Sequence, residues 1–79
     1  MASTQKIQKV QMNVLRSMLR AMGVKFSSYP LADGSVSVLV LSAPEPVLEM
    51  LRLKADRVWK YANPRKGYTA SERFHFAIQ

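Results

Sequence analysis

The sequence contains no cysteine, one histidine and only five acidic residues among 79. Without cysteine, no disulfide can cross-link the chain and no thiolate can bind zinc. A single histidine and scattered acids provide neither a metal-ligand cluster nor a catalytic triad. The motifs of phosphate-binding loops, dinucleotide-binding turns, zinc proteases and serine hydrolases are also missing. We therefore expect a protein that is not an enzyme and that needs no metal or other cofactor.

Long apolar runs are missing as well. The longest run, residues 38–41, is far too short to span a bilayer, and the first residues lack the apolar stretch of a secretory signal. The absence of cysteine fits a reducing compartment. These features predict a cytoplasmic protein that does not associate with a membrane.

The sequence has enough apolar residues for a core and many basic residues for its surface. Apolar residues make up 48% of the chain, which predicts one folded domain over residues 1–79 rather than a disordered chain. Twelve Lys or Arg give a net charge of +7. Such a charge favours nucleic acid or an acidic protein surface as the partner. The alternative is that it only keeps a small domain soluble.

Apolar spacing predicts two helices and three strands. A first helix runs from about residue 7 to residue 22 and ends at Gly23, and its core stripe consists of Ile7, Val10, Val14, Leu15, Met18 and Met22. An Asp33-Gly34 turn joins two alternating strands, the first of which ends near Pro30. A second helix covers about residues 44–62, with Trp59 at the edge of its core stripe. The last strand points Phe74, Phe76 and Ile78 to one side.

The element order α-β-β-α-β predicts an α+β fold with two layers. Two helices would cover one face of a three-stranded, mostly antiparallel sheet. The last strand can pair with either hairpin strand. We favour the first hairpin strand as its neighbour, because every pairing could then be antiparallel.

The polar side of the first helix carries charge of one sign only. At 100° per residue, Lys6, Lys9, Arg16 and Arg20 fall within about 80° of the helix surface, with Asn13 among them. No acid occurs in residues 1–32, so no Glu–Lys pair relieves the repulsion. The second helix, in contrast, mixes both signs and pairs Arg52 with Asp56. We therefore predict a binding face on the first helix. The alternative is a stripe that serves solubility.

A second basic segment lies in the predicted loop after the second helix. Arg65 and Lys66 stand beside Tyr68, and Gly67 allows a close approach of the backbone. Cations can neutralise phosphates and a ring can stack on a base, so this loop is a secondary candidate for nucleic-acid contact.

The outer sheet face is predicted to be polar with one aromatic residue, Tyr29. Sheets that carry single-stranded RNA need two or three aromatics, so no site is assigned there.

Two functions fit these features. The first is a nucleic-acid-binding module that contacts phosphates through Lys6, Lys9, Asn13, Arg16 and Arg20, assisted by the loop. The second is a protein-interaction module or inhibitor that docks on an acidic protein surface, including one that normally holds nucleic acid. Met12, Leu19 and Leu53 would then add apolar contacts. This second role suits the small accessory proteins that viruses encode. A homodimer is compatible with either function.

Overall fold

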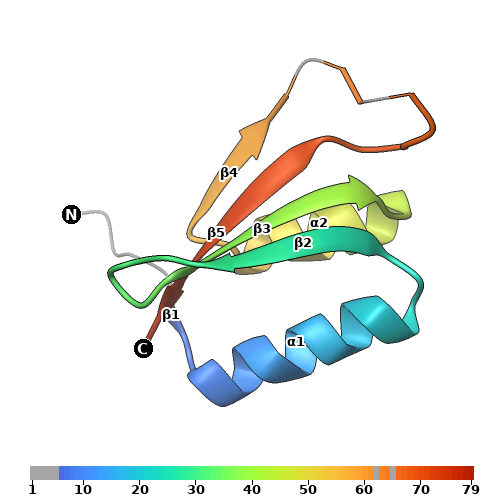
Figure 1. Ribbon diagram of the computed structural model, residues 1–79. Helices are drawn as coiled ribbons and strands as arrows, with labels where there is room; N and C mark the ends of the chain where they lie inside the picture. Colours follow the sequence, from blue (N-terminus) through green and yellow to red (C-terminus); the bar gives the residue numbers. More distant parts are fainter. Residues whose placement is uncertain (1–5, 62, 65) are drawn as a thin grey trace.

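Two helices and a mixed sheet of five strands form from residues 6–61, 63–64 and 66–79, which the computed structural model describes (Figure 1). The α+β class predicted from the sequence is therefore confirmed. The sheet has two strands more than expected. In chain order the elements are β1 (Lys6–Ile7), α1 (Lys9–Ala21), β2 (Lys25–Pro30), β3 (Val36–Ser42), α2 (Glu45–Lys54), β4 (Arg57–Lys60) and β5 (Glu72–Ile78).

The predicted hairpin is present. β2 pairs with β3 in antiparallel register, and β2 ends at Pro30 as expected. In the turn, the Ser35 backbone N–H donates to the Asp33 carboxylate at 2.9 Å, and Gly34 has a φ of +88°. Since this left-handed conformation costs glycine little, the Asp-Gly pair fixes the turn and with it the register of both strands.

The order of the sheet differs from the prediction. β5 pairs antiparallel with β3, not with β2, so among the described residues β3 is a central strand and β2 is a free edge. The alternating valines of β3 are buried on the sheet face that the helices cover. On its other side β5 pairs with β4 in antiparallel and with β1 in parallel orientation.

The second helix ends at Lys54, about eight residues earlier than predicted. The chain then forms β4, whose register places Val58 opposite Phe74 and Trp59 opposite Arg73. Branched and aromatic side chains favour a strand, and pairing with β5 satisfies the backbone of residues 57–60. Asp56 therefore cannot form the predicted helical pair with Arg52. Trp59, predicted near the core, is half exposed.

The inward face of α1 also differs from the prediction. The helix buries Met12, Leu15 and Leu19, whereas Val10 and Val14 are 62% and 63% exposed. Apolar residues cover roughly 200° of this helix, which is more than one packing face can bury. The sheet packs against the side with the longer Leu and Met side chains, which can fill the space beneath it. The Val side of α1 is left facing solvent.

Both helices lie on the same face of the sheet. Phe74, Phe76 and Val38 point to this face and are almost fully buried in one core cluster with residues of α1 and α2. Phe74 and Phe76 were predicted to face the core, and this is confirmed. The two-layer arrangement leaves the opposite face of the sheet without a covering element in the described part of the chain (Figure 1). No helix among the described residues is both long and apolar enough to cross a bilayer.

Candidate nucleic-acid interface

The basic stripe of α1 is shorter than the sequence suggested. Lys6 belongs to β1, where it pairs with Ala77, because the helix begins only at Lys9. Gln8 caps the helix, and its backbone N–H donates to Gln11 Oε1 at 2.9 Å. The helical part of the stripe therefore consists of Lys9, Asn13, Arg16 and Arg20.

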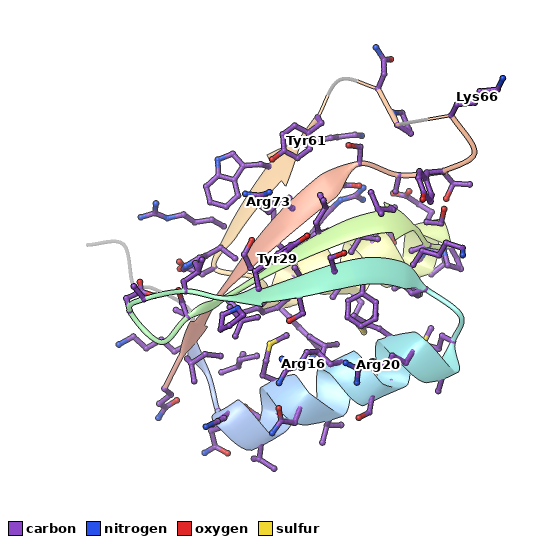
Figure 2. The ribbon with its side chains drawn as sticks, viewed as in Figure 1. Arg16, Arg20, Tyr29, Tyr61, Lys66 and Arg73 are labelled. Carbon is purple, nitrogen blue, oxygen red and sulfur yellow. The ribbon has the colours of Figure 1, made fainter. Side chains whose placement is uncertain are left out.

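Contacts with β2 hold the two arginines of this stripe. Arg16 Nη1 donates to Ser28 Oγ at 3.3 Å, and Arg16 Nη2 donates to Asn13 Oδ1. Arg20 lies over the ring of Phe26, with Cζ 5.8 Å from the ring centroid. Both guanidinium groups therefore lie where α1 faces β2, as the labelled side chains in Figure 2 show. Asn13 has a positioning role within this group.

An open pocket joins these arginines to the later loop. It is lined by Arg16, Arg20, Val24, Lys25, Phe26, Ser28, Leu41 and Tyr68. The loop is held beside it by Thr69, whose backbone N–H donates to Ser42 Oγ at 3.2 Å and whose Oγ1 accepts from the Ala43 N–H at 3.3 Å. The structure thus unites two predicted segments that are about 50 residues apart in the sequence. We refer to Arg16, Arg20, Lys25 and Tyr68 as the basic pocket.

Other predicted site residues do not join the basic pocket. Lys9 lies at the opposite end of α1, and Lys66 is exposed on the loop, away from Arg16 and Arg20 in Figure 2. Arg65 lies outside the described residues. Lys25 was missed as a pocket residue because strict alternation along its strand places it on the same sheet face as Ser27 and Tyr29. The register of β2 and β3 shifts between Lys25 and Phe26, and Lys25 lies at the pocket beside α1.

The acidic residues are used mainly within the protein. Arg52 binds Glu45 and Glu72, and Asp56 contacts Arg57 at 3.9 Å and His75 at 3.3 Å. Among the described residues, the Lys and Arg side chains without such an ion pair are Lys6, Lys9, Arg16, Arg20, Lys25, Lys54, Lys60, Lys66 and Arg73. The positive charge of the basic pocket is therefore not neutralised by a carboxylate of the described residues.

A line of side-chain hydrogen bonds joins Asp56, His75 and Ser35 at the end of the sheet where the hairpin turn lies. His75 Nδ1 lies 3.3 Å from Asp56, and its Nε2 lies 3.0 Å from Ser35 Oγ. These residue types match a catalytic triad, but the Ser35 hydroxyl is buried and donates to Asp33 at 2.5 Å. This serine is poorly placed to attack a substrate. Instead, the line ties the hairpin turn to β5 and to the start of β4.

A third surface is an apolar groove between the helices. It is lined by Ile7, Val10, Gln11, Val14, Leu15, Met18, Met50 and Lys54. The exposed side of α1 forms one wall of this groove. Met12 and Leu19, predicted as contacts for a partner, are buried in the core and do not contribute to it.

Comparison of the chain with protein-family models, with curated proteins and with solved structures finds no match. The function therefore has to be inferred from the surfaces themselves. The basic pocket combines fixed cations, an aromatic side chain and a concave shape.

Proposed function

We propose that the chain is a small nucleic-acid-binding module that contacts phosphates through the basic pocket. The observation that carries this proposal is the convergence of Arg16, Arg20 and Lys25 beside Tyr68. Guanidinium groups match the geometry of phosphate oxygens, and a neighbouring ring can stack on a base or sugar. No single element supplies all four residues.

The contacts of the two arginines support this role. Ser28 and Phe26 restrict Arg16 and Arg20 before any ligand arrives. A side chain that is already ordered loses less conformational entropy on binding, so the same contacts yield a higher affinity. Each guanidinium also keeps donors beyond those that its contacts use, because arginine has five N–H donors.

The distribution of charge supports the same partner class. Because most acids are engaged within the protein, the cations that lack an ion pair create a positive field around it. A polyanion entering this field releases condensed counterions, which favours binding at low salt. The expected interaction is therefore strong at low ionic strength and depends mainly on the phosphate backbone.

The test is a titration of the purified chain against fluorescently labelled single-stranded and duplex oligonucleotides. We expect an anisotropy increase at low salt that weakens steeply as salt approaches the physiological concentration. If neither oligonucleotide binds at low salt, the proposal is wrong.

The protein-interaction function remains the second candidate, because α1 exposes Val10, Val14 and Met18 beside Lys54. An apolar centre with a polar rim is the usual composition of a protein-binding site. An acidic protein that stays bound after nuclease treatment and is lost on Val14→Glu substitution would favour this candidate. Homodimer formation stays a prediction and is measured by sedimentation.

A further inference from the structure

The uncovered face of the sheet carries two aromatic side chains, Trp59 and Tyr61, in addition to the Tyr29 that the sequence predicted there. Tyr29 on β2 and Trp59 on β4 are 47% and 44% exposed, and Tyr61 follows two residues after Trp59 at 45% exposure. The Tyr61 backbone N–H donates to Ser71 O at 2.9 Å, so the ladder with β5 continues to this residue. Since alternate residues share a face, Trp59 and Tyr61 point to the same side. Figure 2 shows Tyr29 and Tyr61 on the same side of the sheet.

The strand registers define how these rings are arranged. One row across the sheet consists of Tyr29, Ser37, His75 and Arg57, and the adjacent row consists of Ser27, Leu39, Arg73 and Trp59. Directly paired residues lie on one face of a sheet. Three strand spacings separate β2 from β4, so Tyr29 and Trp59 lie about 14 Å apart across the strands. That span leaves room for more than one flat ligand group between the rings.

Arg73 occupies the middle of this face. It lies between Leu39 and Trp59 in its row, and Figure 2 shows it between Tyr29 and Tyr61. No carboxylate of the described residues pairs with it, and its Nε is buried without a hydrogen-bond partner. The charge at the centre of the aromatic face is therefore not neutralised within the described part of the protein.

We infer that this sheet face binds single-stranded nucleic acid, with bases stacked on Tyr29, Trp59 and Tyr61 and a phosphate near Arg73. The inference rests on the proposed function and names the class of nucleic acid. Stacking on a ring needs an unpaired base, because bases in a duplex already stack on each other. An unpaired cation among exposed rings complements a chain of alternating phosphates and bases.

β2 connects this face with the basic pocket. Phe26 and Ser28 of β2 line or support the pocket, whereas Ser27 and Tyr29 belong to the open face. Among the strands of the described residues, β2 is also the free edge of the sheet, so none of them separates the two surfaces on that side. A single strand that stacks on the open face can therefore pass over this edge and place its phosphates at Arg16 and Arg20.

The experiment uses Trp59 as the reporter, because it is the only tryptophan in the chain. We titrate the full chain with a short unstructured oligothymidylate and with the same strand annealed to oligoadenylate. Binding is followed by tryptophan fluorescence and by anisotropy of the labelled strand. We expect the single strand to quench the fluorescence and to bind more tightly than the duplex. Binding of the single strand without quenching would overturn the inference.

Two variants separate stacking from charge. Trp59→Ala is expected to weaken single-strand binding by roughly 5- to 150-fold, the range for loss of one stacked base, and to leave duplex binding unchanged. Trp59→Phe keeps a ring and should restore most of the affinity. Thermal melting of both variants checks the fold, which we expect to be retained because Trp59 is half exposed.

The outcomes also distinguish this inference from the proposed function. Equal affinity for single strand and duplex, with no effect of Trp59→Ala, would overturn the stacking face and leave phosphate binding by the basic pocket intact. A chain that binds neither nucleic acid at low salt would overturn both.

Discussion

Arg52 and Glu72 join α2 to β5 through a bidentate ion pair. Arg52 Nε donates to Glu72 Oε1 at 2.9 Å, and Nη2 donates to Oε2 at 2.7 Å. Glu72 is only 3% exposed, although it begins a strand whose neighbouring residues on that face are apolar. The hydrogen bonds from Arg52 to Glu72 and then to Glu45 raise the pKa of Arg52. This pair explains how a carboxylate is accommodated beneath the helix layer.

Replacing Arg52 by Met should strongly destabilise the fold, because it would leave the Glu72 carboxylate buried without a partner. Loss of one member of a buried pair costs about 3–5 kcal/mol, and we expect the lower end because Arg52 itself is partly exposed. Chemical denaturation measures the change. Arg57→Ala is the matched control, since the Arg57 side chain is exposed and its contact with Asp56 is long, which makes an effect close to zero. An equal change in the free energy of unfolding for the two variants would show that the Arg52–Glu72 pair does not stabilise the fold.

Asp33 should make the stability of the fold depend on pH in the acid range. Hydrogen bonds from the Ser35 side chain and backbone lower the pKa of Asp33 below its ordinary value of 3.8. A lowered pKa in the folded state stabilises the fold above the unfolded pKa, and this contribution is lost as pH falls through the folded value. Asp33→Asn should therefore melt at a lower temperature than the parent near neutral pH, and the difference should close below about pH 4. A difference that persists unchanged to about pH 2 would contradict this assignment.

The orientation of α1 gives a clear contrast between two apolar positions. Leu19→Ala removes a fully buried side chain and should cost about 2–5 kcal/mol. Val14→Ala removes an exposed side chain and also raises helix propensity, so its effect should stay within about 0.5 kcal/mol. Both changes are read from the free energy of unfolding. A larger loss for Val14 would mean that the helix packs with its other side inward.

These two positions also show what the sequence could and could not predict. Helical spacing and Gly23 correctly indicated a helix, but both sides of α1 are apolar enough to face a core. Periodicity locates an apolar arc, and only the partner surface selects which part of it is buried. The hairpin was more predictable, because Asp33 and Gly34 fix a turn through local chemistry.

The second helix shows where local periodicity predicts the wrong element. Apolar positions up to Ala62 continued a helical pattern, yet residues 57–60 form β4. The decisive contribution is the pairing with β5, which is distant in sequence and invisible to local periodicity. The same error concealed the aromatic character of the open sheet face, because Trp59 reaches that face only as a strand residue. Arg16, Arg20 and Tyr68 were predicted as candidates, but their meeting at one pocket with Lys25 depends on tertiary structure.

The Arg16→Gln, Arg20→Gln variant should keep the fold with a modest loss of stability. It removes the hydrogen bonds of Arg16 to Ser28 and Asn13 and the contact of Arg20 with Phe26, which together contribute about 1–3 kcal/mol. Thermal melting shows whether the variant is folded at the temperature of the binding measurements. An unfolded variant would show that these arginines are mainly structural.

The salt dependence of nucleic-acid binding by this double variant is the decisive measurement for phosphate binding at Arg16 and Arg20. The slope of log K against log salt should become shallower by roughly 1.4 units for single strands and 1.8 units for duplex, because two phosphate contacts are lost. The control, Lys54→Gln with Lys60→Gln, removes two cations outside the basic pocket and should change the slope much less. An equal change in both variants, or no change in the arginine variant, would contradict phosphate binding at Arg16 and Arg20.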